Sequence, residues 1–300
     1  MSSGNRRRRK SRREKRQTLL QAFCGLMMIL LVTFLVLSCV DMVRNRYAGN
    51  KKEESEEKQE TVTVEPKEEE PDTEDIQPVL LQKEDISLTD TDIYSFLQGP
   101  AAWENRTDWG GSWCNMILAD QYFGAFGCGL CDLANIYSTL TPYECSPIDM
   151  YYYAQEASGY TPVSGLGAID WPELQDTLQS VGINCELRTK DDNYEDFQNA
   201  LAEGITAIVL ISSAYDTTYW KNSDGHYVNL WMYDPADDTA FLADSGNYGY
   251  SRERISLRPV YDALLQASSY QYLLVTSVDT EGNTWQHDGI DIDWVRPDYI

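Results

Sequence analysis

Apolar and polar residues divide the 300-residue chain into zones with different patterns. Residues 17–40 form an uncharged, mainly apolar run that is long enough to cross a bilayer as a helix. Residues 41–90 are rich in Lys and Glu and poor in apolar side chains, so we expect a disordered acidic stalk there. Periodic apolar positions return in residues 91–278, which we predict to fold, and residues 279–300 are expected to form a C-terminal tail.

A helical period of apolar residues begins at or just after Cys128. Leu130, Leu133, Tyr137 and Leu140 recur at three- and four-residue steps, which predicts an amphipathic helix. This places Cys128 at a helix N-terminus. Capping patterns and apolar periods predict further helices over residues 147–153, 171–182, 194–203 and 259–267.

Short runs of β-branched and aromatic residues predict the strands. Residues 205–211 form a bounded apolar run, which is typical of a buried central strand. Residues 226–233 and 240–244 flank the turn-forming sequence DPADD, so we expect a hairpin. Additional strands are expected over residues 183–187 and 270–278. Helices come first and antiparallel strands dominate the second half, so the predicted fold class is α+β.

The basic residues near the start of the chain predict its orientation in a membrane. Arg and Lys dominate residues 1–16, which we expect to remain in the cytoplasm as a basic tail before a transmembrane helix over residues 17–40. The later domain is then extracytoplasmic. The apolar run is longer than that of a cleaved signal peptide, which favours an uncleaved anchor. A loose lipoprotein-like box ending at Cys39 leaves lipidation as an alternative.

The folded region is strongly acidic. The whole chain carries a formal net charge of −24, and acidic side chains outnumber basic ones by about four to one from residue 86 onward. This excess argues against binding to nucleic acid or to an anionic lipid surface. Cationic or neutral ligands fit the charge better, and the pattern does not indicate an oligomeric state.

The predicted extracytoplasmic region contains an odd number of cysteines, which suggests one free thiol in an oxidising compartment. A nucleophilic Cys128 leaves four cysteines that are able to form two disulfides, and the sequence leaves their pairing and oxidation open. Cys128 and Cys131 also form a C-x-x-C pair, but a second ligand pair for zinc is missing. We therefore expect no metal and no cofactor. The remaining cysteines are Cys114, Cys145 and Cys185.

Cys128 and His226 have the properties of a nucleophile and its general base. The helix dipole at the N-terminus favours the thiolate form of Cys128. His226 opens a predicted strand and shares one strand face with Val228 and Leu230, so it is expected to look toward the helix while those neighbours fill the core. Asp244, at the end of the next strand, is the expected acid that orients the imidazole.

Three other residues compete for these roles. Asp234 and Asn247 lie close enough in sequence to replace Asp244 as the orienting group. His287 is the only other histidine of the chain, and it lies in a polar segment that we expect to be solvated. It is the fallback base if His226 is an ordinary strand residue.

The motifs at residues 127–129 (GCG) and 225–230 (GHYVNL), followed by Asp244, resemble the bacteriocin-processing, double-glycine type of cysteine peptidase. The resemblance covers roughly residues 113–278 and implies a papain-like fold with the catalytic order Cys, His, Asp. In that family a glutamine ahead of the nucleophile stabilises the oxyanion together with the backbone N–H of the nucleophile. Gln121, seven residues ahead of the nucleophile, is the matching residue.

The resemblance has limits at two points. Relatives often carry proline or a small residue after Cys-Gly, where this chain has Leu130 and Cys131. Some members are fused to export transporters that face the cytoplasm, and nothing in this chain resembles a transporter or an ATP-binding loop. The double-glycine leader substrate of those members is therefore not carried over.

Together, these observations predict a membrane-anchored cysteine peptidase that hydrolyses peptide or amide bonds of a peptide or protein substrate. Two alternatives remain open. The first is a catalytically inactive surface domain that binds a peptide or glycan in the same cleft, which the many aromatic residues are able to line. The second keeps the chemistry but acts on the peptide cross-links of the cell wall.

Overall fold

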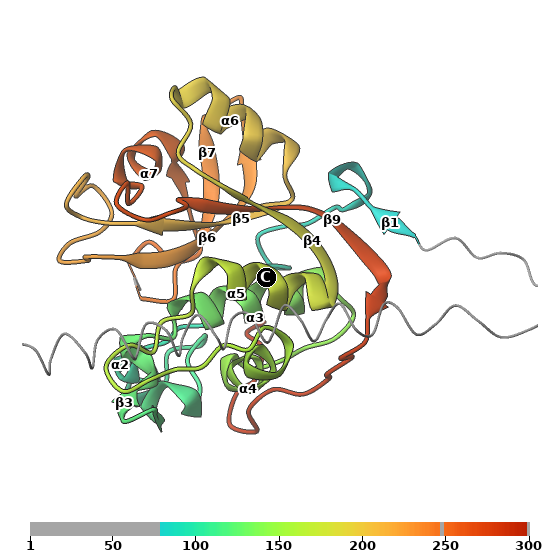
Figure 1. Ribbon diagram of the computed structural model, residues 1–300, viewed down its shortest axis with the longest axis vertical. Helices are drawn as coiled ribbons and strands as arrows, with labels where there is room; N and C mark the ends of the chain where they lie inside the picture. The colour runs from blue at the N-terminus through green and yellow to red at the C-terminus, as the bar shows by residue number, and fades with distance from the viewer. Residues whose placement is uncertain (1–78, 247–248, 299–300) are drawn as a thin grey trace, which may run out of the picture. The chain divides into compact units, whose positions relative to one another are not determined.

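The computed structural model describes residues 79–246 and 249–298, which form a mixed α+β domain (Figure 1). The α+β class is therefore confirmed. The helices are α2 (Pro100–Glu104), α3 (Cys128–Leu140), α4 (Pro147–Ala157), α5 (Trp171–Ser180), α6 (Tyr194–Glu203) and α7 (Leu257–Ala263). Short 3-10 helices cover η1 (Lys83–Asp85), η2 (Ser112–Asn115) and η3 (Phe123–Ala125).

A curled antiparallel sheet forms most of the C-terminal half. Its order is β1-β9-β5-β6-β7-β8, and β4 pairs with β9 outside this path. A separate two-stranded sheet joins β2 to β3. The strands are β1 (Leu80–Leu81), β2 (Ile117–Leu118), β3 (Gln121–Tyr122), β4 (Val181–Arg188), β5 (Thr206–Ile211), β6 (His226–Asp234), β7 (Thr239–Ala243), β8 (Glu253–Ser256) and β9 (Tyr272–Asn283).

The sheet has a hydrophobic layer on each face. One layer packs the sheet against α3, α4 and α5, and the other packs it against α6 and α7 (Figure 1). Every residue of β5 is buried, which confirms the predicted central strand. The helix α3 therefore lies directly on the sheet, and this brings its N-terminus to the strands β6 and β7.

Local capping explains why the predicted helices begin where they do. Ser146 accepts a hydrogen bond from the backbone N–H of Asp149 and completes a capping box before α4. Asp170 forms a capping box before α5, and Asn193 caps α6. The predicted starts of all three helices are confirmed, and α4 continues four residues beyond its predicted end at residue 153.

Several predicted boundaries in the second half need correction. The last helix, α7 (Leu257–Ala263), is shorter and begins earlier than the predicted 259–267. The strand β8 was not predicted because its sequence, ERIS, is polar on the exposed side of the sheet edge. The strand β9 reaches Asn283 rather than residue 278, because its far end pairs with the start of β4.

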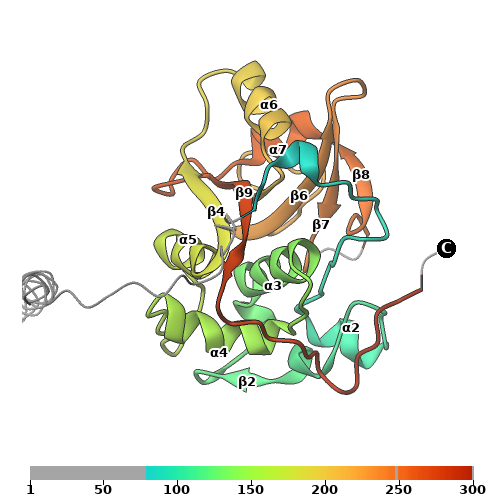
Figure 2. The same ribbon diagram turned by 90° about the vertical axis from the view of Figure 1, so that its right-hand side faces the viewer.

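Both predicted ends of the folded region also differ from the structure. The expected stalk to residue 90 includes β1, which pairs with β9, and Lys83, whose ammonium donates to the carbonyls of Leu201 and Ala202. The predicted C-terminal tail runs along α4 toward α2 (Figure 2). There the ring of Trp285 stacks on the ring of Tyr153, with the two ring centroids 4.1 Å apart. Aromatic side chains therefore hold this polar segment on the domain.

The predicted basic tail, the transmembrane helix over residues 17–40 and most of the acidic stalk lie outside the described residues. Within residues 79–246 and 249–298, every helix is too short or too polar to span a bilayer.

Candidate active site

Cys128 is the first residue of α3, directly after the N-cap residue Gly127. Close packing accounts for both flanking glycines. A Cβ at Gly127 would lie 2.5 Å from the Phe123 ring, and one at Gly129 would lie 2.7 Å from the Cγ2 of Ile169. Larger residues would displace the helix start. The sequence therefore fixes the position of the thiol by letting the backbone come close to its neighbours.

His226 and Asp244 come from the two strands of the predicted hairpin. His226 is the first residue of β6, where it pairs with Ile211 of the central strand. The strands β6 and β7 pair through Asn229 and Ala243, so the residue after β7 returns to the start of β6. The hairpin register therefore brings Asp244 next to His226, although eighteen residues separate them in sequence.

The predicted strand face of His226 is wrong in one respect. Val228 and Leu230 belong to the core layer under α6 and α7, on the face away from α3. Tyr227 and Trp231, on the opposite face, pack in the layer that contains α3. His226 reaches the thiol because it lies at the very end of the strand, next to the N-terminus of α3.

Three donors among the described residues hold the carboxylate of Asp244. His226 Nε2 lies 2.7 Å from Asp244 Oδ1, which also accepts the backbone N–H of Gly246 at 2.8 Å. The indole Nε1 of Trp220 donates to Oδ2 at 2.7 Å. The side chain of Asp244 is fully buried. These contacts fix the imidazole through Nε2 and leave Nδ1 for Cys128.

Cys128 ionises more readily than an ordinary thiol. Burial opposes ionisation, but the hydrogen bond and charge of His226 more than offset it, with help from the backbone N–H groups of Tyr227 and Gly129. The pKa of Cys128 is therefore below its usual value. The N-terminus of α3 favours the same charge state.

The pKa values of the two partners shift in opposite directions, each toward its charged form. Burial lowers the pKa of His226, but the charge and hydrogen bond of Asp244, followed by those of Cys128, raise it well above its usual value. Burial raises the pKa of Asp244, but His226, the Trp220 indole and the Gly246 N–H outweigh this and lower it. The arrangement therefore favours a thiolate at Cys128, an imidazolium at His226 and a carboxylate at Asp244.

The remaining four cysteines of the described region are buried free thiols. Burial raises the pKa of Cys114 and of Cys185 to about 12, and raises those of Cys131 and Cys145 well above the usual value. The possible disulfides are not formed in this structure. Cys128 is thus the one cysteine of the described region whose pKa is lowered.

The competing residues lie elsewhere. Asp234 is at the opposite end of β6, next to the turn of the hairpin. His287 stacks on Trp285, and its Nε2 lies 3.5 Å from a carboxylate oxygen of Asp149, in the C-terminal segment beside α4. Asn247 lies outside the described residues.

The predicted oxyanion donor, Gln121, is located in β3. Its amide Nε2 is buried, has no hydrogen-bond partner among the described residues, and lies against Gly167, where a Cβ would approach it to 2.1 Å. A cavity that opens beside His226 does not include Gln121 in its wall. The oxyanion role of Gln121 stays a prediction.

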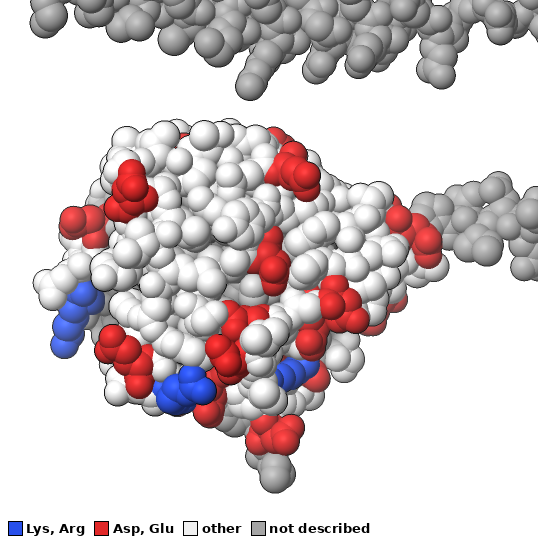
Figure 3. Space-filling model, turned by 90° about the horizontal axis from the view of Figure 1, so that it is seen from below, with Lys and Arg blue, Asp and Glu red and all other residues white. Residues whose placement is uncertain are grey.

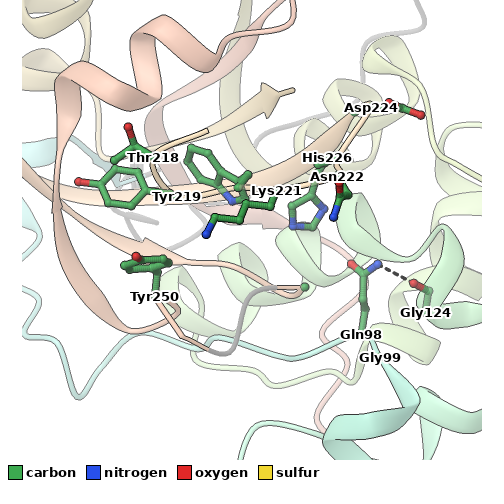
Figure 4. Close-up of a pocket in the computed structure, with 14 residues that line it drawn as sticks. Gln98, Gly99, Gly124, Thr218, Tyr219, Lys221, Asn222, Asp224, His226 and Tyr250 are labelled. Carbon is green, nitrogen blue, oxygen red and sulfur yellow. Dashed lines mark hydrogen bonds between the residues drawn. The ribbon is translucent and has the colours of Figure 1, made fainter. Parts of the chain in front are cut away.

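Gln98 is a site residue that sequence reasoning missed. It lines the cavity beside His226 and donates from Nε2 to the carbonyl of Gly124 at 2.8 Å (Figure 4). Its Oε1 accepts the hydroxyl of Ser245, and its backbone N–H donates to the Ser245 carbonyl. Gln98 Nε2 makes this single donated hydrogen bond to the described residues, so its second amide hydrogen is available to a ligand. The only local signal is the Gly-Pro turn after this residue, and its neighbours lie far along the chain.

The cavity beside His226 has a volume of about 680 Å³ and an open mouth. Its wall comes mainly from the loop between β5 and β6, with contributions from the segment before α2 and from the segment after β7 (Figure 4). Its lining residues are Gln98, Gly99, Gly124, Thr218, Tyr219, Trp220, Lys221, Asn222, Ser223, Asp224, Gly225, His226, Gly246 and Tyr250.

A second polar feature lies behind the nucleophile, between α3 and β6. Asp132 stands one helical turn after Cys128 and is fully buried, and within the described part of the chain neither of its carboxylate oxygens has a hydrogen-bond partner. The Nδ2 of Asn229 and the Nε1 of Trp231 are also buried, and neither finds a hydrogen-bond partner in residues 79–246 and 249–298. Burial, followed by the charge of Cys128, raises the pKa of Asp132 well above its usual value, which favours the neutral form of this carboxyl group.

Neither a search for metal-binding groups nor a comparison with known proteins assigns a further role to these residues. Within residues 79–246 and 249–298, no group of three or more His, Cys, Asp or Glu side chains is arranged to hold a metal ion. No protein-family model matches the chain, and no curated protein matches its sequence.

Proposed function

We propose that this protein is a papain-like cysteine peptidase that hydrolyses peptide or amide bonds. The single observation that carries the proposal is the alignment of Cys128, His226 and Asp244, with the pKa of the thiol lowered and that of the imidazole raised. A buried cysteine with a merely structural role has a raised pKa, as the other four buried cysteines of the described region do.

The acylation step follows from this geometry. The Cys128 thiolate attacks the carbonyl carbon, a C–S bond forms and the carbonyl oxygen takes the negative charge. The imidazolium of His226 then donates its Nδ1 proton to the amide nitrogen. The C–N bond breaks, the amine leaves and a thioester remains on Cys128. Asp244 holds the ring through Nε2 and stabilises its positive charge throughout.

Deacylation uses the same base. The neutral His226 removes a proton from a water molecule, and the resulting hydroxide attacks the thioester carbonyl. The C–S bond breaks, a carboxylic acid is released and the thiolate and imidazolium pair is restored. No redox partner or cofactor enters either step.

The oxyanion is stabilised by two donors in this proposal. The first is the backbone N–H of Cys128, because the first turn of a helix leaves its N–H groups without partners inside the helix. The second is the free amide hydrogen of Gln98, which the cavity beside His226 supports better than Gln121. The anchored, extracytoplasmic location predicted from residues 1–40 is part of the same proposal.

The proposal is tested with the purified domain, a peptide library and a thiol-directed electrophilic probe. We expect turnover and probe labelling to be lost in Cys128→Ala and kept in the matched variant Cys131→Ala. Undiminished hydrolysis by Cys128→Ala would contradict the proposal. Binding of library peptides without turnover would favour the inactive binding domain, and selective digestion of purified peptidoglycan would assign the cell-wall substrate.

A further inference from the structure

Lys221 projects into the cavity beside His226. Figure 4 shows its ammonium group in the space between Tyr250 and His226, whereas the carboxylate of Asp224 points away from it. The side chain of Lys221 is exposed at the cavity mouth, so a ligand is able to reach it. The cavity therefore has a cation in its wall close to the proposed general acid.

The other cations of the described region are already engaged. Residues 79–246 and 249–298 contain nine Lys and Arg side chains. Eight of them contact a carboxylate, a backbone carbonyl or an aromatic ring, whereas no such contact is found for Lys221 within these residues. The eight are Lys83, Arg106, Arg188, Lys190, Arg252, Arg254, Arg258 and Arg296.

The acidic surroundings make this arrangement informative. The face of the domain seen in Figure 3 carries many more Asp and Glu side chains than Lys and Arg side chains. On such a protein an unengaged ammonium has many carboxylates available, and pairing it with one of them would satisfy it. Lys221 instead stands in the cavity without a carboxylate partner among the described residues, which fits a partner that arrives with a ligand.

The position of the cavity indicates which part of a substrate it holds. His226 lines the cavity, whereas Cys128 does not. In the proposed reaction the acyl part of the substrate is bonded to the sulfur of Cys128, and the leaving amine receives its proton from His226. A space on the His226 side therefore accommodates the leaving amine and the atoms attached to it.

We propose that Lys221 binds a carboxylate carried by the leaving-group part of the substrate, so that the enzyme prefers peptides with a negative charge shortly after the cleaved bond. The inference rests on the proposed function. Two sources supply this chemistry, the C-terminal carboxylate of a short leaving peptide and an acidic side chain within it. The Tyr219 and Tyr250 rings, 5.1 Å apart, form the apolar wall beside this subsite.

The first experiment measures turnover of matched peptides. One pair differs only in a free or amidated C-terminus, and a second pair has Glu or Gln after the cleaved bond. Because Lys221 is exposed, we expect an about three- to tenfold preference for the charged member of at least one pair, expressed mainly in KM. The pair that shows it identifies the source of the carboxylate.

The variants assign the preference to this side chain. Lys221→Gln is expected to abolish it, Lys221→Arg to keep it and Lys221→Glu to reverse it. Arg258→Gln is the matched control, because it removes one exposed positive charge on α7, outside the cavity. Equal turnover of both members of both pairs by the unmodified enzyme would overturn the inference, as would an unchanged preference in Lys221→Gln.

A binding measurement separates this inference from the proposed function. Calorimetry with Cys128→Ala compares the same peptides without any turnover. Suppose that the charged peptides bind more tightly in a manner that depends on Lys221, but that the protein with Cys128 intact hydrolyses none of them. This result would support the carboxylate site and contradict the peptidase. Hydrolysis without any charge preference would contradict the carboxylate site and support the peptidase.

Discussion

Cys128 and Cys131 lie three residues apart in the same helix, and both are buried, yet their thiols are opposite in character. The pKa of Cys128 is lowered, whereas burial raises that of Cys131 well above the usual value. Burial alone therefore does not decide the charge state. The difference comes from what each sulfur faces.

The neighbours of the two sulfurs explain the contrast. Cys128 faces the imidazole of His226 and two backbone N–H groups. Burial is the main cause of the raised pKa of Cys131, the negative charge of the nearby Cys128 thiolate adds to it, and a hydrogen bond with Ser245 offsets only part of the effect. One residue thus sits at the open end of the helix next to a cation, and the other sits inside the core. A single helix turn separates a nucleophile from a packing residue.

Removing the base should make Cys128 behave like Cys131, and this is the largest effect that we expect. In His226→Ala, alkylation of Cys128 at pH 6 should slow by about 100-fold or more, because a thiol with an ordinary pKa of about 8.5 is then less than roughly 1% ionised. The rate is measured by mass spectrometry of the alkylated peptides. His287→Ala is the matched control, and an equal loss in that variant would assign the base to His287.

Replacing the amide donor should separate ionisation from oxyanion stabilisation. In Gln98→Ala, turnover should fall by about 10- to 1000-fold, because one donor to the oxyanion is removed. Alkylation of Cys128 should change little, since the thiol and imidazole remain. The same assays on Gln121→Ala decide between the two glutamines, and a larger loss of turnover in that variant would return the role to Gln121.

Removing one hydrogen-bond donor to Asp244 should reduce the difference in reactivity between Cys128 and Cys131 only in part. Trp220→Phe removes the indole donor to Oδ2 and keeps most of the ring. We expect an about three- to tenfold loss of turnover, in line with the loss of one hydrogen bond to a charged group. The pH profile should also narrow on the alkaline side, since a less well held carboxylate lowers the pKa of His226. A profile of unchanged width would show that the indole only packs.

The smallest effect on reactivity is expected at Asp132. Asp132→Asn replaces a carboxyl group whose raised pKa favours the neutral form, so alkylation of Cys128 should change by less than about threefold. Stability should respond instead. The folded pKa is raised above the unfolded value of about 3.9, so the wild-type protein loses stability as the pH rises above that value.

Thermal unfolding at several pH values tests this difference. The variant is expected to be more stable than the wild type at neutral pH and equal to it near pH 3, where the wild-type carboxyl is largely protonated in both the folded and the unfolded state. A gain of about 1 kcal/mol corresponds to a rise in Tm of roughly 2–4 °C for a domain of this size. A variant that is less stable than the wild type at pH 7 would contradict the neutral carboxyl.

Local patterns predicted the parts of the site that depend on local structure. The apolar period after Cys128 placed the thiol at a helix start, and the hairpin turn DPADD fixed the register that joins His226 to Asp244. The mistakes concern longer-range geometry. The alternation of side chains along β6 suggested that the face carrying Val228 packs against α3, whereas this face packs under α6 and α7. Alternation shows which residues share a face, but which layer that face meets depends on all the neighbours of the strand.

Gln98 and β1 were missed for the same reason. Gln98 lies thirty residues before the nucleophile, and its backbone N–H and side chain are hydrogen-bonded to Ser245, 147 residues later in the sequence. The strand β1 is only two residues long and is ordered by β9 from the other end of the domain. The pattern of residues in a short segment does not show which distant segment, more than a hundred residues away, it will contact.

The pH dependence of alkylation, followed separately for each cysteine, tests the central claim most directly. We predict that Cys128 reacts rapidly down to pH values well below its ordinary pKa of about 8.5, whereas the other four buried thiols react only when the domain unfolds. A profile of Cys128 that rises only near or above pH 8.5, like that of an ordinary thiol, would contradict the thiolate and imidazolium pair and with it the proposed catalysis.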